Sequence, residues 1–80
     1  MDEAQESKRL ARAGQRIARL ETRIAQQREM VERLKKDGHS SEAAESMLTT
    51  LEGTLLVMVR HRERILRTLN KGAATDSGNS

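Results

Sequence analysis

Two runs of residues, spaced alternately by three and four positions and almost entirely apolar, dominate this 80-residue chain. Such spacing places the side chains along one narrow face of an α-helix, as at the a and d positions of a coiled coil. The first run is Leu10, Ala13, Ile17, Leu20, Ile24, Gln27, Val31 and Leu34. The second is Ala44, Leu48, Leu51, Leu55, Met58, Arg62, Ile65 and Leu69. We call these positions the seam, and they predict two helices that pack through it.

One short polar segment, residues 35–42, separates the two runs. Two lysines at 35–36 suit the negative end of a helix dipole, and Gly38 can adopt the left-handed conformation that ends many helices. Ser40 or Ser41 can then cap a second helix through its hydroxyl group. The segment therefore predicts a hairpin turn formed by Gly38, His39, Ser40 and Ser41.

These stop and start signals lie close enough together for a short connection between antiparallel neighbours. The predicted fold is all-α, an antiparallel two-helix hairpin resembling a coiled coil, which forms one domain over residues 1–71. The expected elements are a helix at about 5–37, a turn at 38–40 and a helix at about 41–71. Residues 72–80 lack a periodic apolar pattern and are predicted to be a disordered tail.

The position of the turn also predicts the register of the two helices. For a turn centred near residues 39–40, residue i lies opposite roughly residue 79 − i. This rule places Leu10 near Leu69, Ile17 near Arg62, Leu20 near Met58, Ile24 near Leu55 and Val31 near Leu48. Two seam positions are polar: Gln27 can fix the register at some cost in stability, and Arg62 must reach solvent or pair with a carboxylate.

The composition limits how the core can be built. The chain has no Phe, Trp, Tyr, Pro or Cys, so its core consists of aliphatic side chains and methionine, and no disulfide supports it. Two helices bury only the facing edges of their apolar stripes, and the second helix carries more apolar residues beside its seam. We therefore expect two hairpins to associate into a four-helix bundle through Leu55, Leu56, Val59 and Leu66.

Positive charge is unevenly distributed, although the formal net charge is only +3. Basic residues are concentrated in 7–28 and in 60–71, and a hairpin brings these segments together at its open end. The expected basic patch consists of Lys8, Arg9, Arg12, Arg16, Arg19, Arg60, Arg64, Arg67 and Lys71. Such a patch can bind nucleic acid or another acidic surface, although basic helical faces are commonly only solvated.

The chain offers no aromatic side chain for base stacking and no recognised DNA-binding motif. Nucleic-acid or acidic-partner binding through the basic open end is therefore the alternative function. The leading prediction is a non-enzymatic helical module for protein–protein interaction, with a regulatory or adaptor role. It is expected to form a homodimer and to bind a further protein partner.

Neither a catalytic site, a metal site nor a cofactor is predicted. His39 and His61 are the only histidines, and a hairpin holds them far apart, so a turn role and a surface role explain them better than a shared metal. Ser40 and Ser41 lack the glycine-flanked surroundings of a nucleophile and are better explained as caps. Small helical dimers can be enzymes, but no set of residues here assembles such a site.

The pattern of hydropathy also predicts the cellular compartment of the protein. The longest uninterrupted apolar run, Leu55 to Val59, is too short to span a bilayer. Residues 1–9 are polar and do not form a secretory leader. We therefore expect a soluble, cytoplasmic protein without a membrane partner.

Four short elements within residues 23–69 form a recognisable combination. They are Gln27-Arg28 in a basic helix, the turn Asp37-Gly38-His39, the helix start Ala43-Ala44, and a close made of His61-Arg62, Arg64-Ile65 and Leu69. In these elements the chain resembles short uncharacterised helical-hairpin proteins of alphaproteobacteria, such as the rhizobial group. The resemblance implies a bacterial, single-domain helical protein, and it implies no particular activity or ligand.

Overall fold

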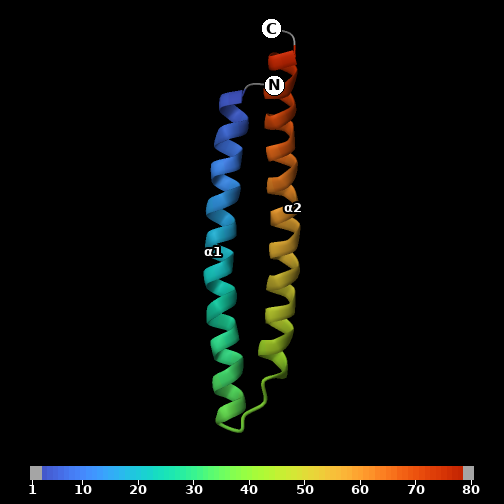
Figure 1. Ribbon diagram of the computed structural model, residues 1–80. Helices are drawn as coiled ribbons and strands as arrows, with labels where there is room; N and C mark the ends of the chain where they lie inside the picture. The colour runs from blue at the N-terminus through green and yellow to red at the C-terminus, as the bar shows by residue number, and fades with distance from the viewer. Residues whose placement is uncertain (1–2, 79–80) are drawn as a thin grey trace.

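The computed structural model describes residues 3–78 and consists of two long helices. Helix α1 spans Glu3–Lys36 and helix α2 spans Glu42–Gly78. They lie side by side and run in opposite directions, so the start of α1 and the end of α2 lie at the same pole (Figure 1). No β-strand occurs in residues 3–78, and the predicted all-α architecture of two packed helices is confirmed.

Backbone hydrogen bonds around Gly38 cap the C-terminal end of helix α1, as the sequence predicts. Gly38 has a φ angle of 73°, in the left-handed region that glycine adopts without strain. The amide of Gly38 donates to the carbonyl of Lys35, and the amide of His39 donates to the carbonyl of Leu34 at 2.9 Å. These two hydrogen bonds form a Schellman motif, which satisfies carbonyls at the end of the helix.

Helix α2 begins after Ser41, but without the expected hydroxyl cap. The carbonyl of Ser41 accepts the first helical hydrogen bond, from the amide of Glu45 at 2.8 Å. Among the described residues, neither Ser40 nor Ser41 forms a hydrogen bond through its side chain. The first turn instead relies on Glu42 and Glu45, whose negative charges favour the positive end of the helix dipole.

The helix ends differ from the expected bounds mainly at the C-terminal side. Instead of ending near residue 71, α2 continues to Gly78, so the backbone of residues 72–78 is helical where a disordered tail was expected. The rest of that tail, residues 79–80, lies outside the described residues. Extending an existing helix adds one hydrogen bond per residue without a new nucleation cost, and Ala73 and Ala74 are strong helix formers.

The core is a single layer between the helices, and it coincides with the seam. All sixteen seam positions are buried or half-buried. The most deeply buried are Ala13, Ile17, Ile24, Val31, Leu51 and Ile65. Glu6, which is 5% exposed, lies four positions before Leu10 and so continues the seam spacing with a carboxylate. Its carboxylate pairs with Arg9 at 3.3 Å, an interaction that sequence reasoning missed because residues 1–9 read as uniformly polar.

Contacts between the helices test the expected register. The 79 − i rule places Arg28 and Lys35 opposite residues 51 and 44, and their observed partners, Glu52 and Glu45, are each one residue further along. Gln27 behaves differently, because its amide donates to the carbonyl of Ala44, about two helical turns nearer the loop than the rule predicts. Ala13 likewise lines a cavity with Met58 and His61, whereas the rule places it opposite residue 66. The rule therefore agrees with the two ion pairs, whose long side chains reach along the axis, but other contacts place the partners on α2 several residues nearer the turn than it predicts.

Candidate interaction surfaces

Two edges flank the seam, and their positions follow from helix geometry. Each residue advances about 100° around an α-helix, so residues just before and just after seam positions line its two sides. Because the helices are antiparallel, residues that precede seam positions on both helices share one side of the rod. Those that follow seam positions share the other.

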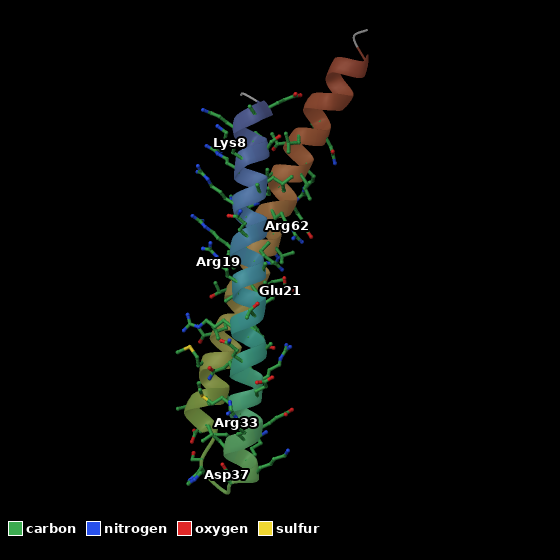
Figure 2. All side chains as sticks on the ribbon, turned by 90° about the vertical axis from the view of Figure 1, so that its left-hand side faces the viewer. Lys8, Arg19, Glu21, Arg33, Asp37 and Arg62 are labelled. Carbon is green, nitrogen blue, oxygen red and sulfur yellow. The ribbon has the colours of Figure 1, made fainter. Side chains whose placement is uncertain are left out.

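Five arginines occupy the first of these sides on α1. Each of them immediately precedes a seam residue, so we call them the arginine edge: Arg9, Arg12, Arg16, Arg19 and Arg23. All five are exposed, and Figure 2 shows basic side chains, with Arg19 among them, projecting to one side of α1. Arg23 was missing from the predicted patch, although its position four residues after Arg19 was a readable signal.

The remaining members of the predicted basic patch are divided between two sides of the rod. Arg60 and Arg67 each stand midway between two seam positions four residues apart, which places them on the outward face of α2. Arg64 immediately precedes Ile65 and therefore lies on the same side as the arginine edge, and Lys71 stands at the equivalent angle seven residues later. Lys8 stands midway between Glu6 and Leu10, which places it on the outward face of α1. The open end is therefore basic all round, but its cations do not form one surface.

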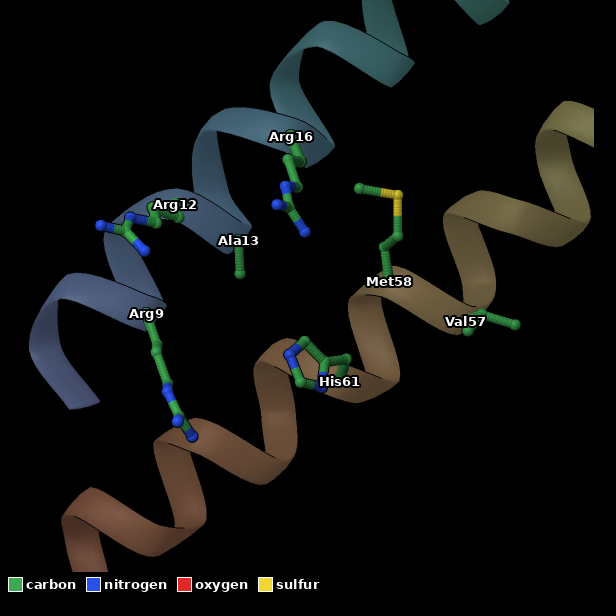
Figure 3. Close-up of a pocket in the computed structure, with 7 residues that line it drawn as sticks. All are labelled: Arg9, Arg12, Ala13, Arg16, Val57, Met58 and His61. Carbon is green, nitrogen blue, oxygen red and sulfur yellow. The ribbon is translucent and has the colours of Figure 1, made fainter. Parts of the chain in front are cut away.

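A groove runs between the arginine edge and α2. Its larger part is an open cavity of about 430 Å³, lined from α1 by Arg9, Arg12, Ala13 and Arg16 and from α2 by Val57, Met58 and His61. In Figure 3, Arg16 and Met58 reach into the space between the helices. A second cavity of about 290 Å³ continues it towards the turn, lined by Arg16, Arg19, Leu20, Arg23, Thr54 and Met58.

The predicted dimer residues lie on the opposite side of α2. Leu56, Val59 and Leu66 each follow a seam position, and we call them the apolar edge. Leu56 is 51% exposed, Leu66 is also exposed, and Val59 is half-buried. Leu55 belongs to the seam and is half-buried against α1, so it only borders this edge. The helix α1 offers small residues at the corresponding positions Ala11, Gly14 and Ala18.

Other surface features carry less chemistry. His39 lies exposed in the turn, whereas His61 lies at the groove, well along α2. Across residues 3–71 no group of three His, Cys, Asp or Glu side chains is arranged to hold a metal ion. Neither described helix combines the length and the apolar character that crossing a bilayer requires.

Comparison with known protein families, with curated proteins and with solved structures finds no match to this chain. The functional argument therefore rests on the two edges and the groove.

Proposed function

We propose that this chain is a non-enzymatic protein–protein interaction module with a regulatory or adaptor role, and that one partner is a second copy of itself. The observation that carries the proposal is the apolar edge. Leu56 and Leu66 expose large aliphatic side chains on one side of α2, where the hairpin has nothing to cover them. Burying this surface in a dimer removes apolar area from water.

The shape of this side also suits a second hairpin. Large side chains on α2 stand beside small ones on α1, because Gly14 and Ala18 follow seam positions there. A methyl group added at Gly14 would meet nothing within 4 Å, so space is available at that level of the rod. A two-fold related copy can place its own leucines against these small residues, which gives a four-helix bundle.

A pair of adjacent substitutions tests self-association. Leu56→Glu puts a charge into the proposed interface, whereas Val57→Glu puts the same charge on the other side of α2, at a residue that is 64% exposed. We expect Leu56→Glu to raise the dimer dissociation constant by about 100-fold and Val57→Glu to leave it unchanged. Sedimentation equilibrium across micromolar concentrations measures both. A wild-type chain that stays a 9.0 kDa monomer contradicts the proposal.

A second candidate function is binding of an acidic partner or nucleic acid through the basic open end. It is favoured by arginines that form no ion pair with a carboxylate of residues 3–71, namely Arg12, Arg16 and Arg19. Binding to a DNA duplex through these charges would fall steeply with added salt. Charge reversal at Arg12, Arg16, Arg64 and Arg67 would remove it, and a chain that does not bind DNA even at low salt contradicts this version.

We further propose that the protein is bacterial and cytoplasmic. The support is the resemblance of residues 23–69 to rhizobial hairpin proteins, together with the absence of a spanning helix in residues 3–78. Fractionation of the source cell tests the location, and recovery in a membrane or secreted fraction contradicts it.

A further inference from the structure

The arginine edge is regular enough to indicate how a ligand would lie along the rod. Arginines precede five consecutive seam positions of α1, from Leu10 to Ile24. They therefore form a nearly straight row parallel to the rod, which extends about 21 Å from Arg9 to Arg23. A row of this length matches about four turns of a helix lying alongside it.

The facing wall of the groove cannot neutralise these charges. The residues of α2 that precede seam positions at this level are Thr50, Thr54, Val57 and His61, none of which is a carboxylate. Within residues 3–71, Arg9 alone of the row forms an ion pair, with Glu6 on its own helix. On the other side of the rod, by contrast, Arg28 and Lys35 each meet a glutamate across the helices.

The floor of the groove is apolar. Ala13, Leu20 and Met58 line it, and Val57 lies at its rim with 64% of its surface exposed. The two cavities share Arg16 and Met58, so they are neighbours along the arginine row.

Two methionines extend this apolar surface towards the turn. Met30 stands seven positions after Arg23, and Met47 stands seven positions before Thr54, so both lie on the groove side of the rod. Both are exposed. Methionine side chains adapt to different apolar partners, which suits a surface that receives another helix.

We propose that this groove binds an acidic amphipathic helix of another protein, with apolar side chains on the floor and carboxylates against the arginine edge. The inference rests on the proposed interaction function and specifies the class of partner. Guanidinium groups pair well with carboxylates, and an apolar floor requires an apolar face on the ligand. Charge complementarity thus requires a negatively charged partner, and the apolar floor requires that one face of the partner be apolar.

A second copy of the chain fits the groove poorly. Within residues 42–71, the side of α2 that holds the apolar edge has one unpaired carboxylate, Glu63, because Glu45 and Glu52 already pair with Lys35 and Arg28. One carboxylate cannot match a row of five arginines. Nucleic acid fits poorly as well, because its phosphates would leave the apolar floor unmatched and the chain has no aromatic side chain for stacking.

The test uses the full chain and a synthetic helical peptide of about 15 residues, which matches the length of the arginine row. The peptide carries leucine at heptad a and d positions and glutamate at the flanking positions. A control peptide has the same composition but leucines scattered around the helix. Fluorescence anisotropy at physiological salt, where charges beyond about 8 Å are largely screened, should show that the amphipathic peptide binds about tenfold more tightly.

Matched variants locate the binding site. The triple substitution Arg12→Gln, Arg16→Gln, Arg19→Gln should weaken peptide binding about tenfold. The control Lys8→Gln, Arg60→Gln, Arg67→Gln removes the same net charge from the outward faces of the two helices and should change binding by less than about twofold. Val57→Glu should weaken binding by repelling the peptide, whereas Leu56→Glu should not. Circular dichroism verifies that each variant is folded.

Several results overturn the inference. One is equal binding of the amphipathic and scattered peptides, or no binding of either. Another is equal weakening by the two triple substitutions. Tighter binding of a DNA duplex than of the peptide, lost in the Arg12, Arg16 and Arg19 triple, would make the groove a nucleic-acid site. Assembly beyond the dimer that the same triple abolishes would make a second copy the occupant.

The two proposals fail separately. A chain that does not self-associate but still binds the peptide contradicts the dimer proposal and supports the groove proposal. A stable dimer that binds no peptide contradicts the groove proposal and supports the dimer proposal. Leu56→Glu and Val57→Glu, at adjacent positions on opposite sides of α2, are expected to separate the two properties.

Discussion

Charged residues form different contacts in the two halves of the rod, one near the turn and the other near the open end. Near the turn, Arg28 and Lys35 form ion pairs with Glu52 and Glu45 on the other helix, and Gln27 donates to the Ala44 carbonyl. In the open half, no hydrogen bond or ion pair links the side chains of the two helices within residues 3–71. The turn half therefore pairs some of its charges across the helices, whereas the charges of the open half form no such pair within residues 3–71.

Exposed branched aliphatic side chains follow the same division, although Met30 and Met47 are exposed nearer the turn. The open half exposes Leu56, Val57 and Leu66, and its groove lies between the arginine edge and Val57. Within residues 3–71, its helices contact each other through packing of the seam, at residues such as Ile17 and Ile65. A hairpin joined covalently at one end can leave the other end available for partners, because the loop keeps the helices together.

Truncation of matched core residues should have the largest effect and tests this comparison directly. Leu51 is 7% exposed in the turn half and Ile65 is 6% exposed in the open half, both on α2. Each change to alanine removes buried aliphatic carbon, and we expect Leu51→Ala to lower the free energy of unfolding by about 3 kcal/mol. Ile65→Ala should cost less in urea denaturation but accelerate amide exchange across the open half. Equal global losses from the two variants would contradict the division.

The turn glycine should give the next largest effect. Gly38→Ala keeps the Schellman motif only if alanine adopts a positive φ angle, so we expect a loss of about 1 kcal/mol in unfolding free energy. Gly38→Asn should lose less, because asparagine tolerates this conformation better. Thermal denaturation followed by circular dichroism compares the two. An unchanged melting temperature for Gly38→Ala would show that the turn does not need this backbone conformation.

Glycine 53 should respond in the opposite direction. It lies inside α2, and an added methyl group would meet nothing within 4 Å. Gly53→Ala should therefore raise the unfolding free energy by about 0.5–1 kcal/mol, since alanine restricts the unfolded chain and favours helix. The same denaturation experiment measures the gain. A loss of stability would indicate that a partner or a second copy packs against Gly53.

Removal of single charges should have the smallest effect and sharpens the contrast between the halves. Arg28→Gln breaks an ion pair of 2.9 Å whose side chains are largely exposed, so we expect a loss of only about 0.5 kcal/mol. Arg19→Gln removes a charge that has no partner in residues 3–71 and should not lower stability. Urea denaturation at low and high salt separates them, because only the Arg28 effect depends on a screened attraction. Equal losses from both would indicate that the arginine edge supports the fold.

Much of the fold was predictable because its signals are local. The spacing of Ile17, Ile24 and Val31 marks the buried face, since helix periodicity alone brings these residues together. Gly38 marks the end of α1, since few other residues accept its φ angle. The buried Glu6 and the continuation of α2 past residue 71 were missed, because both depend on neighbours or on helix extension rather than on local apolar pattern.

The candidate site was only partly predictable. The sequence showed that arginines gather in residues 7–28, but it grouped them with Arg60 and Arg67, which lie on the outward face of α2. It also left out Arg23 and the groove wall at Val57. Proximity at one end of a rod says nothing about which side of the rod a residue faces, and that angle decides which cations act together.

The sequence by itself determined two helices, the seam between them and the glycine turn, because each follows from backbone geometry and the spacing of side chains along one helix. Only the tertiary structure decided which charges are neutralised. Arg28 and Lys35 meet glutamates across the helices, whereas Arg12, Arg16 and Arg19 face threonine, valine and histidine. The physical reason is that ion pairing acts over a few ångströms, so it depends on the residue that the opposite helix places beside each cation.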